Sequence, residues 1–418
     1  MPFSTLGFSP TLSPLLLRAV TDKGFAAPTP VQLAAIPAFL QGRDVLCTAP
    51  TGSGKTAAFV LPLLHQISER PARLAGKTQV LVLVPTRELA AQVGEAFGTF
   101  AKYLPEKVKV AVVFGGVSIN PQMMNLRSGT DIVVATPGRL IDLISHNALS
   151  LSHVKTLLLD EADKLLDMGF ADELANIMAL LPAQRQNALF SATFAPAMEA
   201  LARSLLREPC RINVAAEPDT QPDIVQRAIE VDAPSRTQLL RHLIQSEKWA
   251  RVLVFVATKH TAEIVADKLR KANIEAEPFH GELSQGKRSQ VLMDFKSSVV
   301  QVVVATDVAA RGLDIKALPI VVNYDLPRSA VDYTHRIGRT GRAGLAGIAI
   351  SFVSVATQAH WRLIEKRQGI KVQREQLAGF EAKELAPVNQ ADPAGTGGVK
   401  GKRPSKKDKL RAAAGPSR

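Results

Sequence analysis

Short runs of apolar residues, each bounded by turn-forming residues, recur along the whole chain. They are rich in Val, Leu and Ile and too short to form buried helices. Such nearly continuous apolar strands are typical of parallel sheets that are covered on both faces. In the first half the expected strands are Val45–Ala49, Val80–Val84, Val108–Phe114, Ile132–Ala135, Leu157–Leu159 and Ala188–Phe190. In the second half they are Val252–Val256, Ala276–Phe279, Val302–Ala305, Ile320–Asn323 and Ala349–Val353.

Helical patterns lie between these runs. The clearest are Leu89–Tyr103, Glu173–Leu181, Thr261–Ala272 and Ser289–Phe295. Strands that alternate with helices predict a doubly wound α/β architecture with mostly parallel sheets.

Two composition changes divide the chain. The segment Ala215–Asp223 contains two prolines and no apolar period, which indicates an interdomain linker. From Ala391 the sequence consists largely of Gly, Pro, Ala, Ser and Lys, which cannot bury a core. We therefore expect domains at residues 1–214 and 224–370, a linker at 215–223, and a basic, largely disordered tail at 371–418.

The composition excludes several classes of protein. With 46% hydrophobic residues, the 418-residue chain is not disordered throughout. No apolar run approaches the ~20 residues that span a bilayer, and the first residues do not resemble a secretory signal. Two cysteines, Cys47 and Cys210, cannot form a disulfide framework. We expect a soluble, cytoplasmic protein without membrane association.

Basic charge is concentrated at the end of the chain. The formal net charge is +13, and residues 400–418 hold eight basic residues and one acidic residue, a balance of 8 − 1 = +7. Such a segment favours a polyanionic partner, with nucleic acid the first candidate. A tail that only improves solubility is the alternative.

The sequence Ala49–Thr56, APTGSGKT, follows an apolar strand and precedes an apolar helical segment. A glycine-rich turn followed by Lys and Thr in this context predicts a phosphate-binding loop. Lys55 is expected to contact the β- and γ-phosphates, and Thr56 to offer its hydroxyl to Mg²⁺. The remaining candidate nucleotide ligands of the loop are Thr51, Gly52, Ser53 and Gly54.

An acidic cluster follows a second apolar run, in TLLLDEAD. Asp160 is predicted to hold Mg²⁺, through a water molecule, because a nucleotide site of this type uses a carboxylate at a neighbouring strand end. Glu161 is placed to orient or deprotonate an attacking water. An acidic helix start is the alternative for this cluster in isolation.

Further motifs narrow the class of ATP-binding protein. In order, the chain carries PTPVQ, APTGSGKT, PTRELA, Gly115–Gly116, TPGR, DEAD, SAT, VFVATK, ATDVAARGLDI and HRIGRTGR. This ordered set closely resembles the DEAD-box RNA helicases over roughly residues 1–370. The segment Gly115–Arg127, the compact core and the basic tail look most like the bacterial RhlE group. The resemblance implies two tandem RecA-like domains, ATP and Mg²⁺ as cofactors, and RNA-stimulated ATP hydrolysis.

The resemblance also assigns roles to single residues. Gln32 is expected to bind adenine and Phe25 to stack on it, although a helix cap and a core aromatic are the ordinary roles of such residues. Ser191 and Thr193 are expected to bond to Asp163 and His335 and so to couple the ATP and RNA sites.

A second implied group lies across the domain boundary. Arg339 and Arg342, spaced as on one helical face, should reach the γ-phosphate from the second domain, and Asp314 should contact the ribose. Without the resemblance, these arginines would be interpreted as surface charge.

RNA contacts are expected from both domains, through hydroxyls, glycine amides and arginines that bind the backbone without reading bases. The implied residues are Thr86, Arg87, Gly116, Thr136, Gly138, Arg139, Thr258, Gly281, Gln285, Arg288, Thr306 and Arg311.

The resulting hypothesis is an ATP-dependent RNA helicase that unwinds short duplexes or remodels RNA–protein complexes. It is expected to be a monomer and to act on ribosome precursors or with RNA-decay machinery. A translocating DNA helicase and an ATP-gated RNA clamp remain alternatives. ATPase assays with RNA and DNA would address the first, and strand displacement the second.

Overall fold

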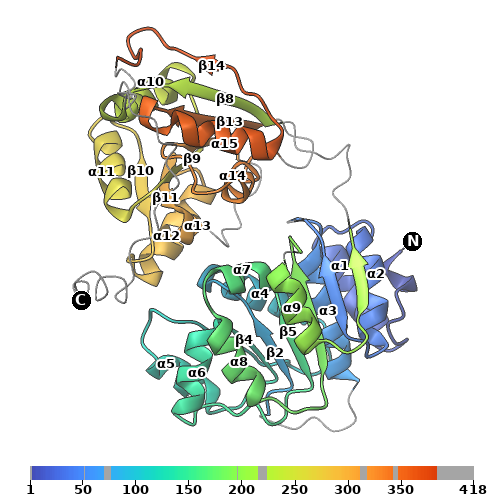
Figure 1. The fold of residues 1–418 in the computed structure, drawn as a ribbon. Helices are drawn as coiled ribbons and strands as arrows, with labels where there is room; N and C mark the ends of the chain where they lie inside the picture. Colours follow the sequence, from blue (N-terminus) through green and yellow to red (C-terminus); the bar gives the residue numbers. More distant parts are fainter. Residues whose placement is uncertain are drawn as a thin grey trace, which may run out of the picture.

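The computed structural model describes residues 2–50, 52–69, 77–194, 196–214, 224–310, 318–341 and 347–383. These residues form two α/β domains, each built around one sheet (Figure 1). The predicted fold class, two tandem RecA-like domains with helices around mostly parallel sheets, is confirmed.

The first sheet has the order β3-β4-β2-β5-β6-β1-β7, and its neighbouring strands are parallel. Its strands are β1 (Val45–Thr48), β2 (Val80–Leu83), β3 (Val110–Val113), β4 (Ile132–Ala135), β5 (Thr156–Leu159), β6 (Gln186–Ser191) and β7 (Cys210–Asn213).

The second sheet repeats this arrangement, with the order β10-β11-β9-β12-β13-β8-β14 and parallel neighbours throughout. Its strands are β8 (Ile224–Glu230), β9 (Val252–Val256), β10 (Ala276–Phe279), β11 (Val302–Thr306), β12 (Ile320–Asn323), β13 (Gly347–Val353) and β14 (Arg374–Glu375). When the strands are counted from the first of each domain, the two orders are identical, so β8 takes the place of β1.

Helices connect the strands and cover the sheets. In the first domain they are α1 (Ser13–Asp22), α2 (Pro30–Leu40), α3 (Lys55–Ser68), α4 (Arg87–Phe100), α5 (Asn120–Leu126), α6 (Pro137–Ser145), α7 (Ala162–Asp167), α8 (Ala171–Ala179) and α9 (Pro196–Leu205). In the second they are α10 (Arg236–Ser246), α11 (Lys259–Arg270), α12 (Gln285–Lys296), α13 (Asp307–Ala310), α14 (Ala330–Ile337) and α15 (Gln358–Gln368).

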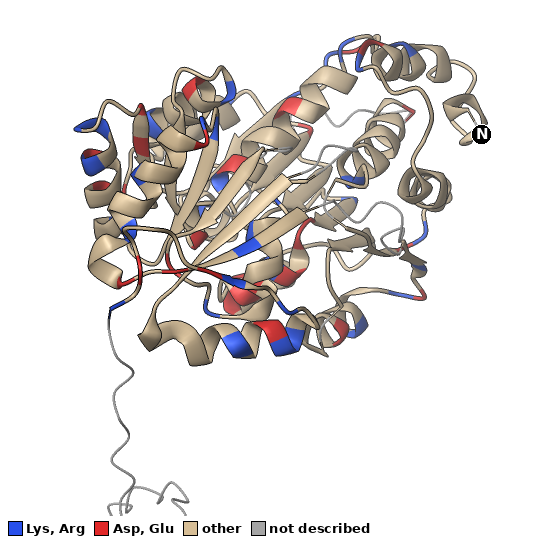
Figure 2. Ribbon diagram, turned by 90° about the horizontal axis from the view of Figure 1, so that it is seen from above, with Lys and Arg blue, Asp and Glu red and all other residues tan. Residues whose placement is uncertain are grey.

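Strand β2 illustrates why the apolar runs are continuous. Val80 and Val82 belong to the apolar cluster on one face of the sheet, whereas Leu81 and Leu83 belong to the cluster on the other face. All four side chains are fully buried. Because both faces are covered, neither can carry polar residues. Figure 2 shows the consequence, since charged residues lie mainly on helices and loops and most strands carry none.

The expected apolar strands are present, with small differences at their ends, but three strands were missed. Strand β7 alternates polar and apolar residues, and β8 contains Gln226 and Arg227. Strand β14 is only two residues long and lies beyond residue 370, in the segment expected to be tail. Leu377 and Phe380 also pack against the core of the second domain. The ordered second domain therefore extends further than predicted.

The two domains differ where their equivalent first strands end. Strand β1 leads into the glycine-rich loop before α3, whereas β8 leads through Val231–Ser235 into α10. The second connection has no glycine and no lysine. Within the described residues, only the first domain has a phosphate loop at this position.

Among the described helices, none combines the length and apolar character that a membrane crossing requires.

Candidate functional site

The glycine-rich loop runs from the end of β1 to the start of α3. Gly54 precedes the helix with φ 92°, a left-handed conformation that favours glycine. A Cβ at Gly54 would come within 2.6 Å of Gln32 Nε2, so the loop also requires a residue without a side chain there. Gly52 has φ 89°, and the Ser53 hydroxyl donates to the carbonyl of Pro50 at 2.8 Å. Thr51 lies outside the described residues.

Lys55 is the first residue of α3 and lies over the loop. Its Nζ donates to the carbonyl oxygen of Ala49 at 2.6 Å. Lys55 and Thr56 also line the cavity above the loop. A cation at a helix N-terminus, beside free backbone N–H groups, creates a site for an anion.

Gln32 and Phe25 occupy one end of the same cavity. Gln32 has the helix-capping role considered as the alternative, because its Oε1 accepts from Thr29 N at 3.0 Å. Its Nε2 donates to the carbonyl of Gly54 at 3.1 Å, which ties the residue to the phosphate loop. Phe25 is 39% exposed and packs against Phe100 with ring centroids 6.1 Å apart. An exposed ring face at a cavity is suited to stacking on a base.

Asp160 follows β5 and is only 3% exposed. The pKa of Asp160 is raised to about 6, mainly by burial and then by the neighbouring Glu161 charge, while Lys55 acts in the opposite direction. Its Oδ1 accepts from Glu161 N at 2.9 Å. A buried carboxylate that is costly to ionise favours a cation beside it. The described residues contain no cluster of three His, Cys, Asp or Glu suited to a metal, so other oxygens would have to complete a metal site.

The phosphate loop, the acidic cluster and the Phe25–Gln32 end together line one cavity of about 550 Å³. From the first domain they include Phe25, Gln32, Gly52, Gly54, Lys55, Thr56, Asp160 and Glu161. From the second domain, Arg339 reaches the same cavity. Arg339 and Arg342 were expected on one helical face. Arg339 does not lie on a helix, because α14 ends at Ile337. Arg342 and Asp314 lie outside the described residues.

Asp163 connects α7 to the end of β6. Thr193 donates to Asp163 Oδ2 from both its backbone nitrogen, at 3.1 Å, and its hydroxyl, at 2.8 Å. Ser191 bonds instead to Thr193, donating to its carbonyl at 2.7 Å. The expected bond between Thr193 and Asp163 is therefore present, whereas Ser191 supports it indirectly.

His335 belongs to α14 of the second domain but is close to α7 of the first. Burial lowers the pKa of His335, and the positive charge of Lys164 lowers it further, while Asp163 raises it. Charged groups of both domains therefore act on His335, and the bonds to Ser191 and Thr193 expected for it are not among the contacts of the described residues.

A second cavity, of about 270 Å³, lies between the domains. Seven of the predicted RNA-binding residues line it: Thr86, Arg87, Thr136, Gly138, Arg139, Gly281 and Arg288. Gly116 lies beside this group, because a Cβ there would come within 2.0 Å of the Arg87 guanidinium. The two domains thus bring together residues about two hundred positions apart.

Arg139 is 8% exposed and has spare hydrogen-bonding capacity. Its Nη2 donates to the carbonyl of Val117 at 2.7 Å, while Nη1 is buried and makes no hydrogen bond within the described chain. A guanidinium with an unused donor beside a cavity is suited to an anion.

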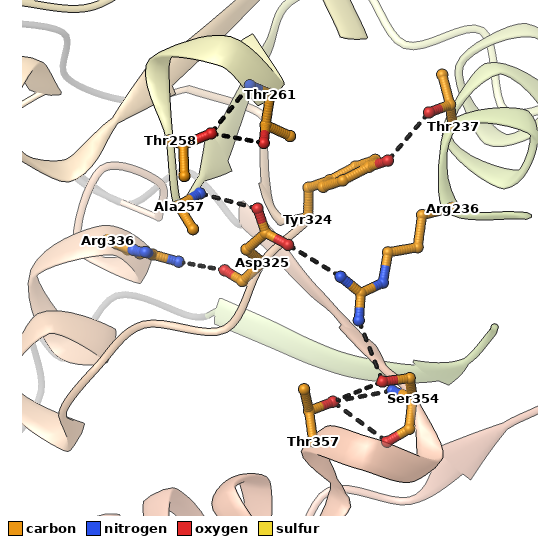
Figure 3. Close-up of polar contacts among 10 residues, drawn as sticks. All are labelled: Arg236, Thr237, Ala257, Thr258, Thr261, Tyr324, Asp325, Arg336, Ser354 and Thr357. Atoms are coloured by element: carbon orange, nitrogen blue, oxygen red, sulfur yellow. Dashed lines mark hydrogen bonds and ion pairs between the residues drawn. The ribbon is translucent and has the colours of Figure 1, made fainter. Parts of the chain in front are cut away.

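Other predicted RNA-binding residues lie outside this cavity's lining. Figure 3 shows Thr258 bonded to Thr261, and the preceding residue, Ala257, donates from its backbone N to Asp325 Oδ2 at 2.8 Å. The same Asp325 pairs with Arg236, and its carbonyl accepts from Arg336 Nη1 at 2.6 Å. Thr258 also caps α11. Gln285 begins α12, Thr306 ends β11, and Arg311 is outside the described residues.

Sequence reasoning missed Glu88, which lies inside the PTRELA motif. Glu88 is 6% exposed, lines the second cavity and pairs with Arg288. It also missed Gln92, Glu95 and Phe100, which line the first cavity from α4. Their helical spacing from Glu88 onward indicates that they lie along one helix. Only the fold shows that this helix, α4, passes both cavities.

Comparison with known proteins gives two family matches. Residues 29–201 match the family described as DEAD/DEAH box helicase, and residues 235–344 match the helicase conserved C-terminal domain. The predicted linker at 215–223 lies between the two matches.

Curated relatives and a solved structure match most of the chain. The ATP-dependent RNA helicase DeaD of Buchnera aphidicola subsp. Baizongia pistaciae is 41% identical over 89% of this chain and 60% of its own length. DeaD of Escherichia coli K12 is 41% identical over 88% of this chain and 57% of its own length. The chain therefore spans about 60% of the length of these relatives. The structure of S. cerevisiae Dbp5 bound to RNA and ADP BeF3 has a TM-score of 0.78 and 31% identity, over 90% of this chain and 95% of Dbp5.

Proposed function

The chain belongs to the DEAD-box helicase family, and on this basis we propose that it is an RNA-dependent ATPase that separates short RNA duplexes. The observation that carries the proposal is the composition of the larger cavity. It combines a phosphate loop and two acidic residues of the first domain with Arg339 of the second. A site completed by both domains makes hydrolysis depend on their arrangement.

The cavity above the phosphate loop suits ATP in one orientation. Its triphosphate would lie on the loop, where Lys55 and the N-terminus of α3 favour negative charge. The base would lie at the end formed by Phe25 and Gln32. Gln32 offers both a donor and an acceptor, which matches adenine N6 and N7 and not guanine O6 and N7.

Mg²⁺ suits the residues beside the loop. Asp160 supplies a buried carboxylate and Thr56 a hydroxyl, both oxygen donors of the kind that Mg²⁺ prefers. When bound, the ion would neutralise phosphate charge. The protein's own residues supply the remaining functions. Glu161 orients the attacking water and accepts its proton, and Arg339 stabilises charge that develops on the transferred phosphoryl group.

RNA fits the cavity between the domains. Its lining has hydroxyls of Thr86 and Thr136, glycine backbone at Gly138 and Gly281, and the Arg139 side chain. Such groups bind phosphate and sugar without reading sequence. Dbp5, which shares this fold, has been solved with RNA, and this supports RNA as the polymer here.

The Asp163–Thr193 contact supports communication between the two sites. Asp163 belongs to α7 and lies three residues after Asp160 in the sequence. Thr193 lies just after the end of β6. The charges of Asp163 and of Arg339 both act on His335 of the second domain. A change in domain arrangement therefore reaches the acidic cluster of the ATP site. RNA stimulates hydrolysis because ATP and RNA both favour the closed arrangement.

Closure would distort one RNA strand in a way that a duplex cannot follow, and a short duplex would then separate. Product release would reopen the domains. An ATP-gated clamp would use the same closed arrangement without strand separation, and a DNA helicase would respond to DNA.

The subgroup within the family, the oligomeric state, the cellular location and the RNA substrate are also proposals. Gly115–Arg127 and the basic tail support the RhlE group, whereas the two curated relatives above carry the name DeaD. We also propose a monomer that acts in the cytoplasm. Its substrates would be ribosome precursors or RNAs handled by the RNA-decay machinery, which is consistent with sequence-independent RNA contacts.

The test compares ATPase activity of the purified chain with RNA and with DNA of the same sequence, alongside displacement of a strand from a short RNA duplex. We expect stimulation by RNA and ATP-dependent displacement. Arg339→Ala should lower kcat at least about tenfold, because such arginines contribute ~10³–10⁵ in other NTPases. Equal stimulation by DNA would contradict the proposal, and RNA stimulation without displacement would indicate a clamp. Lys55→Asn serves as the control that cannot bind ATP.

A further inference from the structure

Lys164, the residue after the DEAD sequence, is almost entirely buried. Its side chain is 7% exposed, and its Nζ lies 2.8 Å from Glu161 Oε2. The Glu161 side chain is itself only 14% exposed. A lysine is seldom buried without a specific partner, because its ammonium group loses strong hydration. The position of Lys164 therefore depends on Glu161.

The Glu161 carboxylate in turn has Lys164 as its charged partner. Its Oε2 atom is shielded from solvent and, within the described part of the chain, accepts no hydrogen bond of regular geometry. The ammonium group of Lys164 compensates the buried charge. The side chain also starts from an unusual backbone, because Glu161 caps α7 with φ 50° and ψ 48°. Left-handed backbone at a non-glycine residue persists only where its surroundings hold it.

We propose that Lys164 is a positioning residue that holds the Glu161 carboxylate toward the attacking water. The proposal rests on the proposed ATPase function. A base must lie within hydrogen-bond reach of the proton it accepts, so its orientation matters as much as its presence. The ion pair fixes one carboxylate oxygen and leaves Oε1 for the water.

An ordinary pair at the start of a helix is the competing explanation, since Lys164 lies three residues after Glu161. Exposed pairs of this kind, such as Arg203 with Glu199, contribute little, because solvent screens them. The pair in the active site is buried and joins a group that takes part in the reaction. An arginine at this position would preserve the cation.

The surroundings of Lys164 reinforce this interpretation. Its backbone N donates to Asp163 Oδ1 at 3.1 Å and to the Glu161 carbonyl at 2.9 Å. Its charge also acts on Asp160 and on His335 of the second domain. Lys164 thus lies among the acidic residues of the ATP site rather than on the outer surface of α7.

The test is RNA-stimulated ATP hydrolysis by the full chain carrying Lys164→Met or Lys164→Arg. Lys164→Met keeps a similar volume and removes the cation. We expect its kcat to fall about 10- to 100-fold, since misplacing a reacting group by about 1 Å can cost 10²-fold. The KM for ATP should stay within about twofold, because the loop and Gln32 are unchanged. Lys164→Arg should recover most of kcat. Lys155→Met, which removes an exposed lysine before β5, is the matched control and should resemble the wild type.

A double variant separates positioning from a loss of folding. In a Glu161→Gln background, Lys164→Met should lower the remaining single-turnover rate by less than about twofold, because residues that act as a unit are not additive. An undiminished kcat in Lys164→Met, or a further tenfold loss in the double variant, would overturn the inference. Loss of ATP affinity together with kcat would also overturn it and indicate a structural role. A wild type without RNA-stimulated hydrolysis would instead refute the proposed function.

Discussion

Arg288 of the second domain and Glu88 of the first form an ion pair across the domain boundary. Arg288 Nη2 lies 2.6 Å from Glu88 Oε1, and Nε donates to the same oxygen at 2.8 Å. Both side chains are 5% exposed, and the guanidinium also lies over the Phe279 ring. Removing one partner of a buried pair leaves an uncompensated charge, at a cost of ~3–5 kcal/mol. A substitution that removes either partner should therefore disfavour the arrangement in which both cavities are complete.

Glu88→Ala should make domain closure less favourable and lower RNA-stimulated kcat at least about tenfold, since 1.4 kcal/mol corresponds to a factor of ten. Energy transfer between fluorophores on the two domains, with RNA and a non-hydrolysable ATP analogue, measures closure directly. Glu199→Ala removes an exposed glutamate of the first domain and is the control. Closure of Glu88→Ala at wild-type ligand concentrations would show that the pair does not stabilise the closed arrangement.

Gln32→Glu should weaken use of ATP. A carboxylate keeps the acceptor that caps α2 but loses the donor that adenine N7 and the Gly54 carbonyl require. The expected result is a higher KM for ATP, measured by steady-state kinetics. The wild type should strongly prefer ATP to GTP, and equal use of the two nucleotides would refute base recognition by Gln32.

ATP hydrolysis should fall as the pH drops below about 6, because burial raises the pKa of Asp160 to about 6 from an ordinary 3.8. Protonation removes the carboxylate that is suited to Mg²⁺, and metal and proton then compete. Raising the Mg²⁺ concentration should therefore move the acidic limb of the kcat/KM profile to lower pH. An acidic limb that is independent of Mg²⁺ would argue against Asp160.

The same group has the opposite effect on folding. Between pH 3.8 and about 6 the folded chain holds a proton at Asp160 that the unfolded chain has lost. The contribution of Asp160 to the free energy of unfolding therefore rises as the pH falls through this window. Denaturant titrations of Asp160→Asn and the wild type, compared across the window, report this contribution.

Deleting residues 391–418 should weaken RNA binding and leave maximal ATPase nearly unchanged. The last nineteen residues hold eight basic side chains and one acidic one. If about four of these contact phosphates, the slope of log affinity against log salt should shrink by roughly 3. RNA binding measured from low to high salt checks this result. Superimposable curves for the full and shortened chains would leave only a solubilising role.

Much of the fold was predictable because both faces of each sheet are buried. Strands such as β2 and β5 must then be apolar at every position, and a continuous apolar run is easily recognised. Strands at or near one sheet edge, β7, β8 and β14, carry polar residues and gave no such signal. The phosphate loop was predictable because its glycines, Lys55 and the flanking elements are contiguous.

Contacts between distant segments were not predictable. Glu88 and Arg288 are two hundred residues apart, and nothing in their local sequence shows that their side chains meet. The burial of Lys164 was not predictable either, since it depends on how α7 packs. The sequence likewise could not show that Arg339 follows α14 rather than lying within it.

Reciprocal coupling between ATP and RNA tests the central claim most directly. The affinity for a non-hydrolysable ATP analogue is measured with and without saturating RNA, and the affinity for RNA with and without the analogue. If both ligands favour one closed arrangement, each should strengthen the other by the same factor, typically about 5- to 150-fold. Affinities that do not change when the other ligand is present would contradict the account, because the two cavities would then act independently.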